Sequence, residues 1–288
     1  MSDFDIYTMI TERIISELEN GVIPWDRPWT GCAEGAFSGA TKKPYSILNQ
    51  MLLGRPGAWF TWQEIQKRGG HVRKGEKASF VVFWKRVPVF DTDPATGEAL
   101  EKLVPMLRYY HVFHADQVES LRLDAVPQPV EIEEHPGAMQ IIVEYLARNA
   151  PLRLESGSVS NRAYYSPSRD LIVVPTMRQF TEQAEYYSTV FHEMTHSTGH
   201  ASRLARLCGT AHFGNEEYSR EELVAEIGAA ALCNISGVES KKSFRNSAAY
   251  IQGWLQALRN DKKLIVQASG AAAKAVDFIL DRPAPRLP

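Results

Sequence analysis

The sequence predicts an α+β protein in two parts: an N-terminal part built on an antiparallel sheet, and a mainly helical C-terminal part with a small sheet. Two β-forming runs, 79–86 and 107–113, flank a polar stretch with a turn sequence at its tip, which indicates a hairpin. Helical periodicity recurs through most of the second half. Because the stretch between the halves is rich in proline and then in acids, we expect domains at 1–125 and 137–288, joined by a linker at 126–136.

Size and composition are consistent with this division. A chain of 288 residues has room for two domains, and 44% hydrophobic with 23% charged residues is typical of a soluble globular protein. No apolar run approaches the roughly 20 residues of a membrane span, and the acidic N-terminus is unlike a secretory signal. Three scattered cysteines without a Cys-x-x-Cys motif argue against a disulfide framework or a thiolate zinc site. We therefore predict a cytoplasmic protein with no membrane partner.

The elements of the first half follow from local patterns. Apolar residues at helical spacing predict a helix over 3–19, which Asn20 and Gly21 end. We then expect, in chain order, a short helix at 48–53, a strand around 59–62, a helix at 63–67, a basic glycine-rich turn at 69–77, and the hairpin, with a polar excursion at 88–103.

The second half is predicted to be helical around two short strands. Ala163–Tyr165 and Leu171–Val174 have strand composition and flank a turn with the sequence Ser-Pro-Ser-Arg-Asp. The predicted helices are 138–149, a helix ending near Gly199, a helix beginning near Ser219, an amphipathic helix at 243–259 and a last helix at 264–280.

A His-Glu-x-x-His sequence lies at 192–196 within one of these helical patterns. Four residues are about one helical turn, so His192 and His196 point the same way and can bind one metal ion. Glu193 lies one position round, where it can take a proton from a metal-bound water and act as a base. The ligand types favour zinc, although manganese or cobalt could occupy the same site. The motif therefore predicts a zincin-type site.

A third metal ligand is needed, and the sequence offers several. Glu222 and Glu226 lie four residues apart on the next helix, so one can bind the metal while the other hydrogen-bonds a ligand imidazole. Ser219 and Glu222 can also form a capping box, which would place Glu222 at the helix terminus. His200 is a further alternative, but Gly199 precedes it as a helix stop. We expect Glu222 as the ligand, with Glu226 either hydrogen-bonded to a ligand imidazole or serving as the alternative ligand.

The first half has a strong local excess of positive charge. Between residues 41 and 90, ten lysines and arginines face two glutamates, a net charge of +8 in a chain whose total is −2. Aromatic residues alternate with these cations, and unpaired bases need flat faces for stacking. This pattern favours single-stranded nucleic acid over a duplex. The expected contacts are residues in turns that contain glycine or proline: Lys42, Lys43, Tyr45, Arg73, Lys74 and Lys77.

Six blocks in order give the chain a family resemblance. They are Thr41–Asn49, Gly69–Lys77, Val82–Lys85, Tyr165–Ile172, His192–His200 and Glu221–Gly228. Together they resemble the plasmid antirestriction proteins of the ArdC type, which are related to the N-terminal part of conjugative-plasmid primases.

The resemblance implies a domain that binds single-stranded DNA, a zincin-like metallopeptidase domain, and a role in protecting an incoming conjugative plasmid from host restriction enzymes. It also implies that His192, His196 and Glu222 bind the metal and that Glu193 is the catalytic base.

Three functional hypotheses remain open at this point. The first is a DNA-protecting protein that binds single strands and has an accessory peptidase domain. The second is a metallopeptidase that the basic half brings to a DNA-bound host protein, with strand 171–174 offering its edge to an extended substrate. The third is a binding protein whose metal only stabilises the second domain.

Overall fold

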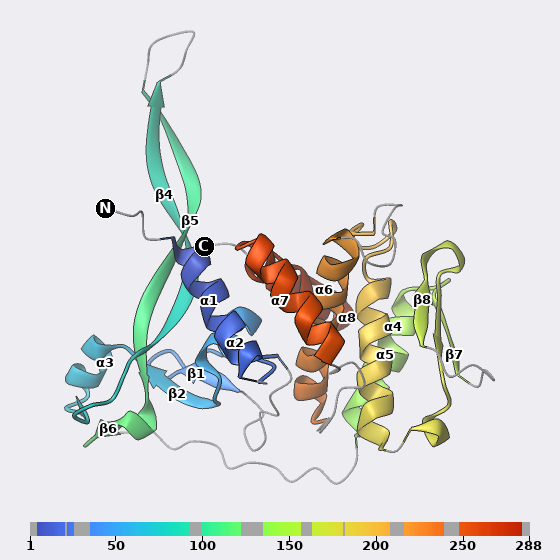
Figure 1. Cartoon of the computed structure of the whole chain (residues 1–288), viewed down its shortest axis with the longest axis horizontal. Helices are drawn as coiled ribbons and strands as arrows, with labels where there is room; N and C mark the ends of the chain where they lie inside the picture. Colours follow the sequence, from blue (N-terminus) through green and yellow to red (C-terminus); the bar gives the residue numbers. More distant parts are fainter. Residues whose placement is uncertain are drawn as a thin grey trace.

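The computed structural model describes residues 5–20, 22–25, 35–92, 99–121, 135–156, 163–180, 182–207, 216–238 and 248–283. The predicted linker, apart from its last two residues, and the tip of the predicted hairpin lie outside these ranges. The predicted α+β class is confirmed. Sheet strands dominate the N-terminal half, and helices with a small sheet make up the C-terminal half (Figure 1).

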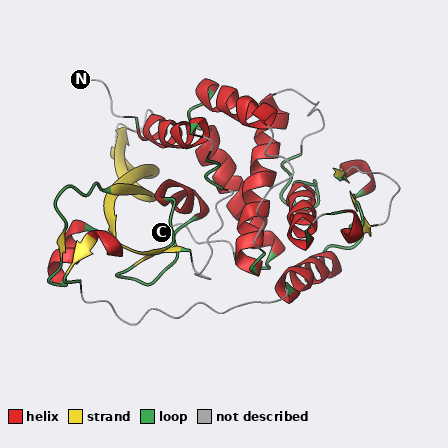
Figure 2. Cartoon of the chain, turned by 60° about the horizontal axis from the view of Figure 1, so that its bottom comes forward, coloured by secondary structure: helices red, strands yellow, loops and turns green. Residues whose placement is uncertain are grey.

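The helices are α1 Ile6–Glu19, α2 Ile47–Leu53, α3 Trp62–Lys67, α4 Pro136–Arg148, α5 Gln183–Ser197, α6 Glu216–Ser236, α7 Ala248–Asn260 and α8 Leu264–Ile279. The strands are β1 Ala36–Ser38, β2 Gly57–Phe60, β3 His71–Val72, β4 Ser79–Thr92, β5 Ala99–His114, β6 Val118–Glu119, β7 Arg153–Ser156, β8 Tyr164–Ser166 and β9 Leu171–Val174. Figure 2 shows that most of the helices gather between the two groups of strands.

The main N-terminal sheet has the order β1-β2-β5-β4. It is antiparallel as predicted, except that β1 and β2 form a short parallel pair. The strands β4 and β5 pair continuously from Ser79 opposite Val112 to Thr92 opposite Ala99, and the ribbon that they form projects beyond the helices (Figure 1). The polar excursion predicted at 88–103 is therefore mostly strand, because the paired backbone hydrogen bonds continue after the apolar pattern fades.

The small C-terminal sheet has the order β7-β9-β8. The run Leu171–Val174 is apolar throughout, and all four residues are buried because β9 is the central strand. The hypothesis that β9 offers its edge to a substrate is therefore wrong, since β7 and β8 occupy both of its edges. Within the described residues, β8 is an edge strand.

One hydrophobic core is built from both halves of the sequence. It joins α1, α2 and the base of the ribbon to α6, α7 and α8; its fully buried members include Ile10, Ile14, Leu223, Ile227, Leu258, Ile265 and Ala272. Trp25 is also buried there, edge-on to Trp254 at 5.1 Å between ring centroids, and Thr11 Oγ1 donates to the Lys262 carbonyl at 2.7 Å. The predicted boundary at 126–136 would thus divide the sequence within a shared core.

A second core surrounds the helix with the metal-binding motif. It contains buried residues of α4, β9, α5, α6 and α8, among them Tyr145, Ile172, Val190, Phe191, Met194 and Leu232. Among the described residues, no helix is both long and apolar enough to span a membrane.

Candidate metal centre

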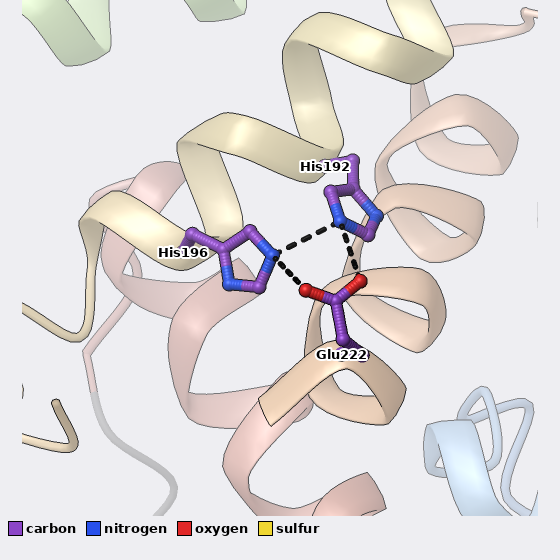
Figure 3. Close-up of side chains that lie close together, drawn as sticks. All are labelled: His192, His196 and Glu222. Carbon is purple, nitrogen blue, oxygen red and sulfur yellow. Dashed lines mark hydrogen bonds and ion pairs between the residues drawn. The ribbon is translucent and has the colours of Figure 1, made fainter. Parts of the chain in front are cut away.

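Helix α5 places the two motif histidines on one side. The predicted apolar stripe of Tyr187, Val190, Phe191 and Met194 is buried, which fixes the rotation of the helix. His192 and His196, one turn apart, have ring centroids 4.7 Å apart and an interplanar angle of 77°. Their Nε2 atoms are 3.0 Å apart and point into the same space (Figure 3).

Helix α6 brings Glu222 to the same space. The helix begins at Glu216, six residues before Glu222, so the alternative in which Glu222 caps the helix is wrong. Glu222 Oε1 lies 3.4 Å from His196 Nε2, and Oε2 lies 3.7 Å from His192 Nε2 (Figure 3). All three side chains are largely excluded from solvent.

These three residues fit a divalent metal ion. Ligand atoms at about 2.0–2.2 Å from a tetrahedral ion lie about 3.3–3.6 Å from one another. The two Nε2 atoms are 3.0 Å apart, and each lies 3.4 or 3.7 Å from a different oxygen of the Glu222 carboxylate, so the separations fall around that range. Two imidazole nitrogens and a carboxylate oxygen are also a donor set of catalytic zinc sites, which keep a fourth position open. His192, His196 and Glu222 could therefore hold one ion.

Two further carboxylates lie on the opposite nitrogens of the histidines. Glu226 Oε1 is 3.5 Å from His192 Nδ1, and Glu221 Oε1 is 3.3 Å from His196 Nδ1. A carboxylate at Nδ1 fixes the tautomer and the ring orientation, which leaves Nε2 for the metal. This geometry favours the outer role for Glu226 over the alternative of a third ligand.

Sequence reasoning missed the role of Glu221 and of Arg206. Arg206 Nη2 donates to Glu221 Oε1 at 2.9 Å and also to the Thr195 carbonyl, and Arg206 Nη1 donates to Thr198 Oγ1. The arginine thereby ties Glu221 to the C-terminal turn of α5. The pair Glu221-Glu222 was visible in the sequence, but no local signal links an arginine ten residues after His196 to this site.

These charges shift the protonation of the site. Burial acts to lower the pKa of His196, but its hydrogen bonds with Glu221 and Glu222 raise that pKa to about 10. Burial acts to raise the pKa of Glu221, and the contacts with His196 and Arg206 outweigh it and hold the pKa below its ordinary value. In the metal-free site His196 is thus protonated at neutral pH, and a metal must displace that proton.

Glu193 is 1% exposed and follows His192 on α5. Its charge acts on His196, which places it within electrostatic reach of the ligand space. His200, the other alternative ligand, is engaged elsewhere, because its Nδ1 lies 2.7 Å from Ser202 Oγ and accepts the Ser202 amide. The described residues thus bring together the two histidines and Glu222, with Glu193 beside them.

A buried ionic network ties the end of α5 to the edge strand β8. Arg203 contacts both carboxylate oxygens of Asp170, at 2.5 and 3.1 Å, and its Nε donates to the Ser197 carbonyl. Tyr165, in β8, donates its hydroxyl to Asp170 at 2.7 Å. Burial acts to raise the pKa of Asp170, but Arg203 and Tyr165 hold that pKa below its ordinary value. The network fixes the position of β8 relative to α5.

The predicted DNA contacts lie in two turns of the N-terminal half. Lys42 and Lys43 are exposed in the turn after β1, and Tyr45 is partly buried beside it, with burial raising its pKa to about 12. Lys74 and Lys77 are exposed in the turn between β3 and β4. Arg73 is already engaged there, in an ion pair with Glu76 at 3.3 Å and in a short contact with the Asp116 carbonyl.

Comparisons with known proteins agree with this arrangement. The profile of the N-terminal domain of the anti-restriction factor ArdC matches residues 4–113, and that of a zincin-like metallopeptidase family matches residues 142–271. The metal-free crystal structure of the antirestriction ArdC protein from plasmid R388 is 36% identical, with a TM-score of 0.75 over 96% of this chain and 97% of that one. This chain belongs to the ArdC family.

Other relatives extend the comparison. The Mn(II)-bound structure of the same ArdC protein superposes with a TM-score of 0.76 at 33% identity, over 98% of this chain and 99% of that one. An uncharacterised protein of Sinorhizobium fredii, y4eC, is 31% identical over 96% of this chain and 91% of its own length. Two DNA primases named TraC, from Escherichia coli, are 32% and 31% identical over 95% of this chain. The chain spans 27% and 20% of the length of those primases.

Proposed function

We propose that this member of the ArdC family binds single-stranded DNA in the cytoplasm and protects incoming conjugative plasmid DNA from host restriction. The observation that supports DNA binding is the excess of positive charge in the segment 41–90, whose described turns present Lys42, Lys43, Lys74 and Lys77 to solvent. Tyr45 and Arg73 complete the proposed contacts. Family membership supports the role in protection.

Binding to labelled single-stranded and double-stranded oligonucleotides over a range of salt concentrations tests the DNA part. We expect a preference for the single strand and a log–log salt slope of several units, about 0.7 for each phosphate contacted. Replacing Lys42 and Lys43 by glutamine should flatten that slope. Binding that is absent, or that does not change with salt, would contradict the proposal.

Transfer of a conjugative plasmid into restricting and non-restricting recipients tests the protective part. The wild-type protein should raise transfer only into the restricting recipient. The lysine variants should lose that gain in proportion to their loss of DNA affinity. Equal transfer with and without the protein in a restricting recipient would argue against protection.

A metal-dependent peptidase is the second candidate function. In this proposal His192, His196 and Glu222 hold the ion, while Glu226 and Glu221 orient the two rings. When bound, a divalent ion supplies Lewis acidity, which lowers the pKa of water and polarises a carbonyl. Zinc is the proposed ion by ligand type, with manganese or cobalt as substitutes. The observation that favours this candidate is the buried carboxylate of Glu193, which a purely structural site would not need.

In peptide hydrolysis, Glu193 would then transfer the proton and β8 would bind the substrate. The Glu193 carboxylate would accept a proton from the attacking water as the water oxygen bonds to the peptide carbonyl carbon. Glu193 would then pass that proton to the amide nitrogen as the C–N bond breaks. An extended substrate could pair with the edge of β8, the strand that the Asp170–Arg203 network fixes beside α5.

Glu193→Gln separates the peptidase from a purely structural metal site. We expect about one metal ion per chain and unchanged DNA binding in this variant, with cleavage of host proteins lost. His192→Ala should lose both the cleavage and the metal ion. If Glu193→Gln processed a susceptible protein as fast as the wild type, Glu193 would not be the base.

A further inference from the structure

The ribbon of β4 and β5 has two faces with different surroundings. Because residues paired across the strands share a face and alternate along each strand, Val82 and Leu107 lie on one face, with Phe80 and Tyr109. That face packs into the core shared with α1 and the C-terminal helices. The other face carries Val81 and Val112, which are buried at its base with Tyr45 against them.

Beyond this base, the second face is open and aromatic. Phe83 is 46% exposed and Tyr110 is 44% exposed. Their ring centroids lie 5.9 Å apart, and the ring centroid of Tyr45 lies 6.1 Å from that of Phe83. Three rings therefore follow one another across the sheet, with Phe83 in the middle.

The same face carries cations and no described acid. Arg108 is directly opposite Phe83, and Lys85 is opposite Met106, two pairs further along the ribbon and so on the same face; both cations are exposed. Neither cation has an acid as its cross-strand partner, because Arg108 pairs with Phe83 and Lys85 pairs with Met106. The residues of this face from Ser79 to Val87 and from Val104 to Val112 include no aspartate or glutamate.

We propose that Tyr45, Phe83, Tyr110, Lys85 and Arg108, here called the ribbon face, form the surface on which bases of single-stranded DNA stack. This inference rests on the proposed DNA-binding function and assigns it to a surface. Exposed rings offer flat faces to unpaired bases, and adjacent cations neutralise the phosphates between them. Apart from Tyr45, these residues lie outside the set that the turns suggested. The proximity of Lys42 and Lys43 to Tyr45 in the sequence connects the ribbon face to one of the basic turns.

The charge on this face decides between possible occupants. An exposed apolar patch by itself fits a protein partner or a second copy of this chain equally well. Aromatic rings alternating with unopposed cations, on a face without carboxylates, are complementary to a polyanion with bases that can stack. Association of two copies through this face would bring Lys85 and Arg108 of each copy together, which like-charge repulsion disfavours.

The test compares adjacent residues on opposite faces of the ribbon. Phe83→Ala and Tyr110→Ala, in the full chain, should each weaken binding of a labelled oligothymidylate by about 5- to 150-fold. Trp84→Ala is the matched control, because Trp84 follows Phe83 on β4, is 40% exposed and lies on the other face. It should bind as the wild type does. Phe83→Trp should restore affinity, and Arg108→Gln should reduce the log–log salt slope by about 0.7.

The outcomes separate the inference from the function on which it rests. A wild-type chain that binds no oligonucleotide would contradict both. Normal binding by Phe83→Ala and Tyr110→Ala, with melting temperatures like the wild type, would overturn the ribbon face and leave DNA binding in place. An equal loss in Trp84→Ala would also overturn it. The ribbon face would also be overturned if Phe83→Ala or Tyr110→Ala kept its DNA affinity but lost a dimer that light scattering detects in the wild type. The face would then bind a second copy of the chain.

Discussion

At the scale of single residues, the nitrogens of two imidazole rings decide what the site can bind. Each ring has a carboxylate on Nδ1, Glu226 for His192 and Glu221 for His196. The two Nε2 atoms are therefore left facing Glu222. Arg206 keeps Glu221 ionised and in place through a hydrogen bond of 2.9 Å.

Neutralising one carboxylate of the site at a time should show, from the loss of metal affinity, which carboxylate binds the metal and which only orient the histidines. Glu221→Gln and Glu226→Gln should each weaken metal affinity by about 10- to 100-fold, since such outer partners orient the ligands without binding. Glu222→Gln should weaken it far more. Competition with a chromophoric chelator measures all three, and Glu119→Gln, an exposed residue of the N-terminal half, is the control. A loss of metal affinity in Glu226→Gln as large as that in Glu222→Gln would show that Glu226 is a ligand and not an orienting residue.

Metal affinity should also depend on pH. The pKa of His196 in the metal-free chain is raised, so the ring is protonated below that pKa and must lose its proton when a metal binds. The apparent metal affinity should therefore rise with pH between 6 and 8, with proton release that isothermal titration in buffers of different ionisation enthalpy can count. In Glu221→Gln the pH dependence should be shallower, because one of the three carboxylates that raise the pKa of His196, those of Glu221, Glu222 and Glu193, becomes a neutral amide. A flat profile in the wild type would contradict this account.

At the scale of elements, the separation of α5 and α6 sets the size of the site. Gly228 lies on α6 where the helix faces Thr195 of α5. A Cβ at this position would lie 2.7 Å from Thr195 Cγ2 and 2.8 Å from Thr195 Oγ1, closer than van der Waals contact allows. The glycine therefore permits the approach that brings Glu222 to the histidines.

Gly228→Ala should force the two helices apart. We expect a loss of stability of about 1–3 kcal/mol, as for other overpacked interiors, together with weaker metal binding. Gly253→Ala in α7 and Gly270→Ala in α8 are matched controls, because nothing lies within 4 Å of a Cβ at either position. They should instead gain up to about 1 kcal/mol from helix propensity. Thermal unfolding of the three variants gives the comparison, and a Gly228→Ala chain as stable as the controls would show that α5 and α6 can adjust.

At the scale of the whole molecule, the two halves of the sequence share a core. Helix α1 packs on the helices that follow the metal site, and Arg259 forms an ion pair with Glu19 at 2.6 Å. The stability of the C-terminal half therefore depends on contacts such as this one, whose partners lie 240 positions apart in the chain. Such a core predicts that both halves unfold together.

Ile14→Ala tests this coupling at a core residue that belongs to neither proposed site. Ile14 is fully buried, so we expect a loss of about 2–5 kcal/mol. The unfolding midpoint should fall by the same amount whether it is followed by tryptophan fluorescence or by metal release. Val143→Ala, at a residue that is 57% exposed, should change neither midpoint. Two separate transitions, with metal release unaffected by Ile14→Ala, would instead support independent domains.

Features that depend on neighbours along the chain could be predicted from the sequence. The spacing of His192 and His196, the buried stripe of α5, the ribbon strands and the α+β class all follow from local periodicity. The same rules favoured Glu222 over Glu226 as the ligand, but the contacts that the two carboxylates make depend on the rotation and distance of α6 relative to α5, at the approach of Gly228 to Thr195. The rules could not find Arg206, show that β9 is central, or reveal which face of the ribbon is open. Those features arise where distant segments pack together, and only the tertiary structure decides which side chains meet there.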